Sequence, residues 1–341
     1  MKITEILSSL LHGRHLSQED ARWMMERIMS GEVTDAQIGA YLTALRMKGE
    51  TVSEIAGSAQ AMREKALRVR AGGIVVDTCG TGGDGIGSFN ISTTTAFIVA
   101  ACGVTVAKHG NRSISSKSGS ADVLLELGVK IDIEAEVVER CLQEAGVGFL
   151  FAPRHHGAMR HAMGPRKELG YYTIFNLLGP LTNPAGAARQ LIGVFDAKWV
   201  EPMARTLGRL GSRHALVVHG FDGLDEISTT GPTHVAELEP DGGVKTYTVE
   251  PEQFGLPRAE LADLRGGDAT LNAGITRRIL EGEPGPRRDI ALLNAGAALK
   301  VAGVAADIGA GLAMAAKALD AGKALERLQQ LIEISNQPLD F

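Results

Sequence analysis

The chain has 341 residues, 44% hydrophobic and 22% charged, so it can bury a full core in one large domain or two. A formal net charge of −5 gives no basic footprint for nucleic acid, and we expect no nucleic-acid partner. No apolar run could span a bilayer, and Glu5 and Ser8 interrupt the N-terminal stretch where a secretion signal would be apolar, so we expect a cytoplasmic protein without a membrane partner.

Residues 1–72 are predicted to form a small helical domain. Apolar residues recur at helical spacing between Ile3 and Leu11. Three later helices are expected where an N-capping residue is followed three positions on by a residue that can cap in return. These pairs are Ser17 with Asp20, Thr34 with Gln37, and Thr51 with Glu54.

Residues 73–341 are predicted to form a larger α/β domain. The segment IVVDTCG, residues 74–80, is a short β-branched run ending in glycine, as expected of a buried parallel strand that enters a loop. Strand and helix patterns then alternate, which predicts a mostly parallel central sheet with covering helices. The other strands of this alternation are expected at 104–108, 190–195 and 215–220, and the helices at 90–101 and 120–128.

Three segments stand outside this alternation. Residues 165–188 include a stretch rich in Asn, Gly and Pro, and are predicted to return to the N-terminal helices and join the helical domain. Alternating residues on both sides of Asp241-Gly242 predict a β-hairpin. Residues 291–331 are rich in Ala and Leu and are predicted to be helical.

The glycine-rich loop that follows the first strand raises the question of its ligand. Gly80, Gly82 and Gly85 satisfy GxGxxG, but a dinucleotide site needs an acidic residue after the next strand, and Lys108 stands there. A P-loop needs a lysine that this segment lacks up to Thr95. The remaining features are free amides, hydroxyl side chains and a helix N-terminus, which favour an anion; an ordinary tight turn is the alternative.

Two further loops strengthen the prediction of a phosphate site. Residues 108–122 begin with three potential cations and continue with five serines, a pattern that could enclose a polyanion, although a solvated serine loop would look similar. Asp225 and Glu226 follow a predicted strand and could bind Mg²⁺, which uses one or two carboxylates together with substrate phosphates. Adjacent acids on a surface turn are the alternative.

The segments GTGGDG, FNIST, VAKHGNR, SSKSGSAD, FLFAP, FNLLGPLTNP and HGFDGLDE occur in this order over nearly the whole chain. Together they resemble the anthranilate phosphoribosyltransferases. The resemblance implies a helical domain with an α/β domain, as in pyrimidine nucleoside phosphorylases, and a homodimer formed through the helical domain. The implied reaction joins 5-phosphoribosyl diphosphate to anthranilate, releases diphosphate, and is the second step toward tryptophan.

The resemblance also implies a set of site residues. Two loops would bind 5-phosphoribosyl diphosphate. The first loop would contribute Gly80, Gly83, Asp84, Ser88, Asn90, Ile91, Ser92 and Thr93. The second would contribute Lys108, His109, Gly110, Asn111, Arg112, Ser113, Ser115, Ser116 and Ser120. Anthranilate would contact Gly80, Asn111, His156 and Arg166, while Ser92, Asp225 and Glu226 would hold Mg²⁺.

The chemistry implied by the resemblance gives three residues a catalytic role: Lys108, His109 and Arg166. Cleavage of the sugar C1–O bond builds negative charge on diphosphate, which Lys108, the loop amides and Mg²⁺ would offset. The planar fork of Arg166 suits the anthranilate carboxylate, although a surface arginine is the alternative. His109 could accept the amine proton late in the reaction, or it could only pack or donate to phosphate.

The chain departs from the family pattern at two positions. Ser88 stands where threonine is usual and keeps the hydroxyl, whereas Tyr172 replaces the arginine that is usual in RTxFN. Two other kinds of protein would share some of these sequence features: a pyrimidine nucleoside phosphorylase, and a non-catalytic relative that binds nucleic acid. The GTGGDG and KHGNR segments favour the transferase, and the net charge opposes the second rival.

Overall fold

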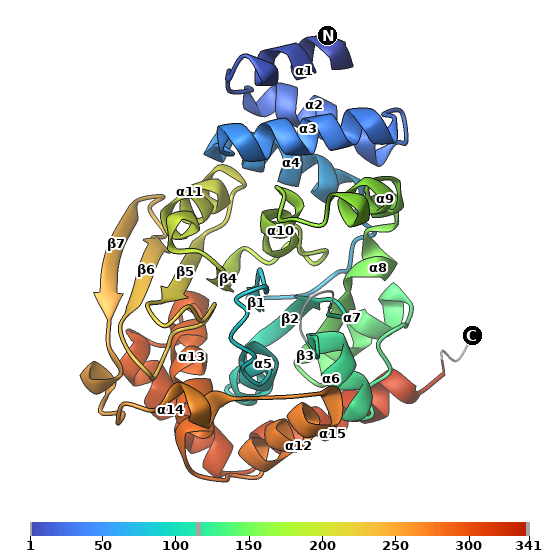
Figure 1. Ribbon diagram of the computed structural model, residues 1–341. Coiled ribbons are helices and arrows are strands. Elements are labelled where there is room, and N and C mark those ends of the chain that lie inside the picture. The colour runs from blue at the N-terminus through green and yellow to red at the C-terminus, as the bar shows by residue number, and fades with distance from the viewer. Residues whose placement is uncertain (1, 114–116, 339–341) are drawn as a thin grey trace.

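The computed structural model of the protein describes residues 2–113 and 117–338. Its N-terminal part is a bundle of four helices, drawn in blue in Figure 1. The predicted capping residues begin three of them, because the Ser17, Thr34 and Thr51 hydroxyls each accept a hydrogen bond from the backbone three residues on. The bundle consists of α1 (Ile3–Leu11), α2 (Gln18–Met29), α3 (Asp35–Lys48) and α4 (Val52–Lys65).

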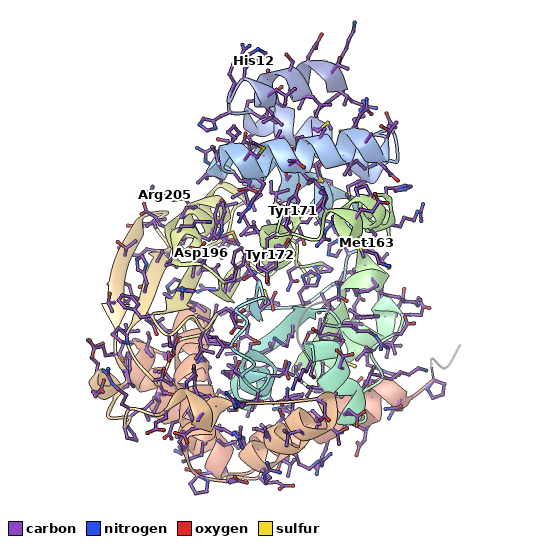
Figure 2. All side chains as sticks on the ribbon, viewed as in Figure 1. His12, Met163, Tyr171, Tyr172, Asp196 and Arg205 are labelled. Carbon is purple, nitrogen blue, oxygen red and sulfur yellow. The ribbon has the colours of Figure 1, made fainter. Side chains whose placement is uncertain are left out.

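A later segment of the chain, from α8 to η2, packs against this bundle. Helix α8 (Ala152–His155) leads through a 3₁₀ turn, η1 (Gly157–Met159), into α9 (Arg160–Leu169), and then α10 (Phe175–Leu178) and η2 (Gly179–Leu181) follow. Phe175, Leu178 and Leu181 are buried in one apolar cluster with side chains of the bundle. Figure 2 shows Tyr171 and Tyr172, between α9 and α10, below α3. This segment therefore links the bundle to the α/β part of the chain.

The described residues form one seven-stranded sheet with the order β3-β2-β1-β4-β5-β6-β7. The first five strands in the chain run parallel, β6 pairs antiparallel with β5, and β7 pairs antiparallel with β6, which confirms a mostly parallel sheet with a terminal hairpin. In register, Gly80 pairs with Gly193, so β1 and β4 end level with each other. The strands are β1 (Val75–Gly80), β2 (Thr105–Gly110), β3 (Val147–Phe151), β4 (Arg189–Gly193), β5 (His214–Gly220), β6 (Thr233–Leu238) and β7 (Val244–Val249).

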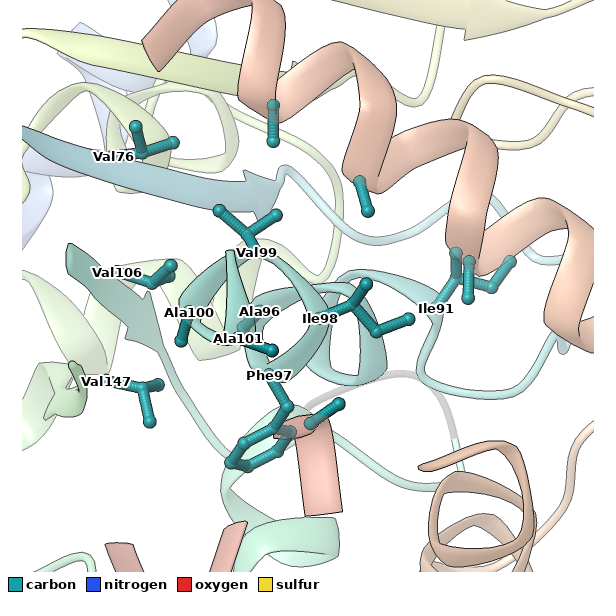
Figure 3. Close-up of a cluster of buried hydrophobic side chains, with 14 of the residues drawn as sticks. Val76, Ile91, Ala96, Phe97, Ile98, Val99, Ala100, Ala101, Val106 and Val147 are labelled. Atoms are coloured by element: carbon teal, nitrogen blue, oxygen red, sulfur yellow. The ribbon is translucent and has the colours of Figure 1, made fainter. Parts of the chain in front are cut away.

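Helices cover both faces of the sheet, and two apolar clusters form the core. Figure 3 shows α5 (Ile91–Ala101) directing Val99 and Ala100 toward Val76 and Val106 of the strands. On the same face lie α13 (Pro286–Ala302), α14 (Ile308–Asp320) and α15 (Lys323–Asn336), which replace the continuous helical stretch expected for 291–331. The opposite face packs on α11 (Val200–Arg209) and the bundle. Leu191 and Ile192 alternate between the two clusters, as neighbours in a strand must.

The remaining elements connect these layers. They are α6 (Ser120–Glu126), α7 (Ala135–Glu144) and α12 (Ala269–Leu280), with the 3₁₀ turns η3 (Ala197–Trp199), η4 (Pro251–Phe254) and η5 (Leu261–Leu264). Helices α7, α11 and α12 and strand β3 were not predicted from the sequence. None of the helices in residues 2–113 and 117–338 has the length and apolar character needed to cross a membrane.

Candidate active site

The candidate site lies where the parallel strands end. The loops after β1, β2 and β5 begin at Gly80, Gly110 and Gly220. The β5 loop crosses the ends of two other strands: a Cβ on Gly80 would contact the Asp225 carboxylate, and a Cβ on Gly193 would overlap the Asp225 backbone. Glycine at both positions therefore allows the predicted metal-binding acids to approach the glycine-rich loop.

Asp225 and Glu226 are tied to the glycine-rich loop and to the helix that follows it. The Gly82 N–H donates to Asp225 Oδ2 over 3.0 Å, and the Ser92 N–H in the first turn of α5 donates to Glu226 Oε1 over 3.1 Å. Asp84 lies in the same loop, and its Oδ1 accepts the Ile86 N–H over 3.2 Å. The structure therefore brings three acidic residues, from two loops, to one side of the α5 N-terminus.

The charges of these acids are only partly balanced by protein groups. Burial, with the Asp84 charge adding to it, raises the pKa of Asp225 to about 7. Burial and the Asp225 charge raise the pKa of Glu226 well above its usual value, and burial also raises the pKa of Asp84. Asp84 Oδ2 has no hydrogen-bond partner among the described residues. Added positive charge would relieve this excess, which makes the cluster chemically suited to a divalent cation.

The donor set suits a cation that brings other ligands with it. In the part of the chain that the structure describes, no group of three or more His, Cys, Asp or Glu side chains is arranged to hold a metal ion. Mg²⁺ is commonly bound through one or two carboxylates, several waters and substrate phosphates. Asp225 and Glu226 fit that mode, with oxygens from a phosphorylated ligand completing the shell.

Lys108 lies beneath the site. Only 4% of the residue is exposed, and its Nζ donates to the Thr78 carbonyl over 2.7 Å and to Ser92 Oγ over 3.2 Å. Burial lowers the pKa of Lys108, although the charge of buried Asp77 acts in the opposite direction. Two of the three Lys108 donors are thus directed to protein oxygens, one of them the Ser92 hydroxyl.

Asp77 is a buried acid that the sequence analysis missed. Its Oδ1 accepts the His109 N–H over 3.2 Å, and its Oδ2 accepts from Asn183 Nδ2 over 2.8 Å. Asn183 also donates to the Ala107 carbonyl over 2.8 Å. Asp77 thus joins β1, β2 and the return segment directly below the site. The sequence signal that could have identified it is a carboxylate inside a buried apolar strand.

Two buried histidines, one at the end of β2 and one directly after α8, face each other. The His109 and His156 ring centroids are 5.1 Å apart, and His109 Nδ1 lies 3.1 Å from the Gly179 carbonyl. That contact requires a proton on Nδ1, which leaves Nε2 as an acceptor. Burial lowers the pKa of His109 to about 3 and that of His156 to about 4, so both are neutral at pH 7. The Nε2 atoms of both rings have no partner among the described residues.

Arg166 lies on α9, within the return segment. Its guanidinium carbon is 4.9 Å from the centre of the Phe175 ring, and the guanidinium forms no hydrogen bond or ion pair with another described residue. Burial lowers the pKa of Arg166 but leaves it a cation at neutral pH. A half-buried guanidinium with unused donors is suited to an organic anion such as a carboxylate.

The loop after β2 is folded back on the start of α6. Ser120 Oγ donates to the Asn111 carbonyl over 3.4 Å, and Asp122 accepts the Ser113 and Gly119 N–H groups over 3.2 and 2.9 Å. Gly110 lies so close to Ser120 that a Cβ on Gly110 would contact the Ser120 hydroxyl. Asn111 and Arg112 are exposed, and Arg112 lies 3.9 Å from Asp122. Ser115 and Ser116 fall outside the described residues.

The other predicted residues of the first loop are held by the C-terminal segment. Ser88 forms an isolated bridge with Arg265, and Asn90 Oδ1 accepts from Asn272 Nδ2 over 2.8 Å. Ile91 is buried in the core and offers the site only its backbone, while the buried Thr93 hydroxyl lacks a partner among the described residues. Asn272, like Asp77, was missed by the sequence analysis.

Two family models match the chain. One, described as the helical bundle domain of a glycosyl transferase family, matches residues 4–66, and the other, described as the a/b domain of that family, matches residues 72–325. The anthranilate phosphoribosyltransferase of Thioalkalivibrio sulfidiphilus is 55% identical over 336 residues, which cover 98% of this chain and 99% of the relative. The chain belongs to the anthranilate phosphoribosyltransferase family.

Solved structures of anthranilate phosphoribosyltransferases have the same fold. The crystal structure of the Thermus thermophilus enzyme is 44% identical, with a TM-score of 0.92 over 97% of this chain and 99% of that one. The Saccharomyces cerevisiae enzyme, solved in complex with 5-phosphoribosyl diphosphate and Mg, is 28% identical, with a TM-score of 0.89 over 98% and 97% of the two chains. These matches favour a transferase over the phosphorylase and nucleic-acid-binding alternatives, while the roles of individual site residues stay predictions.

Proposed function

We propose that the protein transfers the 5-phosphoribosyl group of 5-phosphoribosyl diphosphate to the amine of anthranilate, giving N-(5-phosphoribosyl)anthranilate and diphosphate in tryptophan biosynthesis. The observation that carries this proposal is the full-length match to a relative of that activity, 55% identical over 98% of the chain. The glycine-rich loop beside three acids at the ends of the strands provides a chemically suitable site.

We propose that Mg²⁺ is the cofactor and that Asp225, Glu226 and the Ser92 hydroxyl hold it. The excess of buried carboxylates supports this assignment, as does the yeast relative solved with 5-phosphoribosyl diphosphate and Mg. When bound, the ion would offset the negative charge that develops on diphosphate. The amides of the glycine-rich loop and the N-terminus of α5 would favour the same charge from the protein side.

The acceptor is positioned by residues of the return segment in this proposal. Arg166 would hold the anthranilate carboxylate, and its unused donors support that role. The aromatic amine is uncharged at neutral pH, so alignment matters more than deprotonation, and it can contribute about 7–11 kcal/mol. His109 Nε2 is a neutral acceptor for the amine proton once the new C–N bond forms.

We also propose the wider setting of the enzyme. The helical domain would comprise residues 1–72 with the return segment 165–188, and the α/β domain residues 73–341. The protein would be a homodimer through the helical domain and would work in the cytoplasm. Free cysteines at all three positions, 79, 102 and 141, support a reducing compartment.

An assay of anthranilate fluorescence tests the proposed reaction. The purified protein should consume anthranilate only when both 5-phosphoribosyl diphosphate and Mg²⁺ are present, and it should release one diphosphate for each anthranilate consumed. Phosphorolysis of thymidine or uridine serves as the comparison reaction. Cleavage of either nucleoside without anthranilate consumption would assign the protein to the phosphorylases instead.

A further inference from the structure

Two consecutive tyrosines in the return segment contact opposite parts of the molecule. Tyr171 Oη lies 2.6 Å from Thr43 Oγ1 on α3, and Thr43 Oγ1 donates its own proton to the Gly39 carbonyl over 2.7 Å. Tyr171 is therefore the donor to Thr43, since a hydroxyl has a single proton. Figure 2 shows both tyrosines between the helical bundle and the strand ends.

Tyr172 points instead to the glycine-rich loop. Its hydroxyl donates to the Gly83 carbonyl over 2.9 Å. A Cβ on Gly83 would overlap this hydroxyl, and Gly83 has a φ of +80°, so glycine is needed both for the close approach and for the backbone conformation. A residue absent from the usual family pattern thus contacts the loop predicted to bind diphosphate.

This hydrogen bond fixes the direction of a backbone amide. The Gly83 carbonyl belongs to the same planar peptide as the Asp84 N–H, and in a trans peptide the two groups point in opposite directions. With its carbonyl held by Tyr172, the peptide directs the Asp84 N–H away from the tyrosine. The hydroxyl of Tyr172 therefore sets the direction of a loop amide as well as the position of the loop.

The Tyr172 ring is itself held at the base of the loop. It packs edge-on against Phe195, with ring centroids 4.9 Å apart and an angle of 63° between the planes. The Phe195 N–H donates to Thr81 Oγ1 over 3.0 Å. On the far side of the loop, the Gly82 N–H is bonded to Asp225. Tyr172 is thus a contact through which the return segment restrains a loop that is also held by the sheet, by Asp225 and, near Ser88, by the C-terminal segment.

We propose that Tyr172 is a positioning residue for 5-phosphoribosyl diphosphate. Its hydroxyl orders the Gly83–Asp84 peptide for binding the phosphorylated sugar, and it does so from the segment that also carries Arg166. This inference rests on the proposed function. The Tyr172 hydroxyl acts on the glycine-rich loop alone. Its removal therefore weakens binding of the phosphorylated substrate and leaves anthranilate binding and the chemical step nearly unchanged.

Two matched substitutions test the inference. Tyr172→Phe removes the hydroxyl and keeps the ring against Phe195, while Tyr171→Phe removes the neighbouring hydroxyl, which bonds only to the helical bundle. For Tyr172→Phe we expect the KM for 5-phosphoribosyl diphosphate to rise about three- to tenfold, equivalent to about 0.7–1.4 kcal/mol. Its kcat and its KM for anthranilate should stay within about twofold of the wild type, and Tyr171→Phe should stay within that range in all three constants.

A binding measurement separates failure of this inference from failure of the proposed function. Calorimetric titration of 5-phosphoribosyl diphosphate with Mg²⁺, without anthranilate, should give a Kd raised by the same factor in Tyr172→Phe, with an unchanged melting temperature. An unchanged KM and Kd would overturn the inference, and so would an equal loss in Tyr171→Phe, because the effect would then belong to packing of the segment. A wild-type protein that binds the sugar but consumes no anthranilate would overturn the proposed reaction alone.

Discussion

At the scale of single residues, the site is dominated by buried acids whose charge exceeds that of the nearby cation. The charge of buried Lys108 acts on Asp225 and Glu226, but its hydrogen bonds are directed to Thr78 and Ser92. Burial penalises each carboxylate unless a partner offsets its charge. A site of this kind gains most from a ligand that arrives with a divalent cation.

The acids of the β5 loop can be tested by removing charge without changing size. In Asp225→Asn with Glu226→Gln we expect turnover to fall by a factor on the order of 10²–10³ and the Mg²⁺ concentration for half-maximal rate to rise. The reason is that the variant holds Mg²⁺ less well, and the ion's charge no longer offsets the negative charge that develops on diphosphate. Initial rates over a series of Mg²⁺ concentrations measure both effects. The exposed Glu281→Gln variant is the control, and normal turnover of the double variant at low Mg²⁺ would refute the assignment.

Arg166 allows a separate test of acceptor recognition. Hydrogen bonds to charged groups contribute about 1.5–3 kcal/mol, so Arg166→Ala should raise the KM for anthranilate by about 10- to 100-fold with a small effect on 5-phosphoribosyl diphosphate. Steady-state kinetics with each substrate varied in turn measures this difference. Arg160→Ala removes an exposed arginine from the same helix and should change neither constant. Equal losses for both substrates would exclude a specific role in anthranilate binding.

At the scale of elements, local patterns predicted the parts of the fold that depend on neighbours in sequence. Thr34 and Thr51 marked helix starts because a cap involves residues three positions apart, and Asp241-Gly242 marked the β6–β7 turn. Strand β3 was missed because VGFLF is a short, uniformly apolar run without turn residues of its own. The contact between Asn90 and Asn272 joins residues 182 positions apart, which no local pattern encodes.

Strand β6 carries a buried acid that is expected to make the stability of the sheet depend on pH. Glu237 accepts hydrogen bonds from His214 over 2.8 Å, from Tyr247 over 2.8 Å and from Lys300 over 2.7 Å. Burial alone raises the pKa of Glu237, but these donors outweigh it and lower the pKa to about 2. The network joins β5, β6 and β7 to α13, so its charge state bears on the antiparallel edge of the sheet.

The sign of the pH effect follows from that lowered pKa. Above about pH 4.5 the Glu237 carboxylate is ionised in both the folded and the unfolded chain, and its stabilisation of the fold is fully present. Between about pH 4.5 and 2 only the unfolded chain takes up the proton, so up to about 3 kcal/mol of the free energy of unfolding is lost. Calorimetric unfolding across this range should show a shallower loss in Glu237→Gln, which starts from a lower stability at pH 7. Glu239→Gln, on the more exposed end of the same hairpin, should keep the wild-type slope. Equal slopes for all three proteins would exclude Glu237 as the source.

At the scale of the whole molecule, the site depends on how the helical bundle meets the sheet. Cys79 and Ile192 of the sheet belong to the same apolar cluster as Tyr41 and Leu42 of the bundle. Arg63 on α4 adds polar links, since its guanidinium donates to the Leu181 and Leu210 carbonyls over 2.5 and 3.2 Å. The bundle is therefore packed onto the α/β part, so a change at its outer surface need not disturb the site below.

The outer surface of the bundle is where the proposed dimer can be tested. Leu11 and Met47 on α1 and α3 are 78% and 83% exposed, among the most exposed large apolar side chains of the described residues. Burying them against a second copy would stabilise the dimer by about 25 cal/mol for each Å² of apolar surface removed from water, and a glutamate at either position would oppose that burial.

Sedimentation should give the wild type twice the chain mass of 36.0 kDa, and Leu11→Glu with Met47→Glu should return the monomer mass. Leu271→Glu on α12, where the native side chain is 50% exposed in the α/β part, should remain dimeric. A monomeric wild type would refute the dimer, and a double variant that stays dimeric would move the interface away from these two helices.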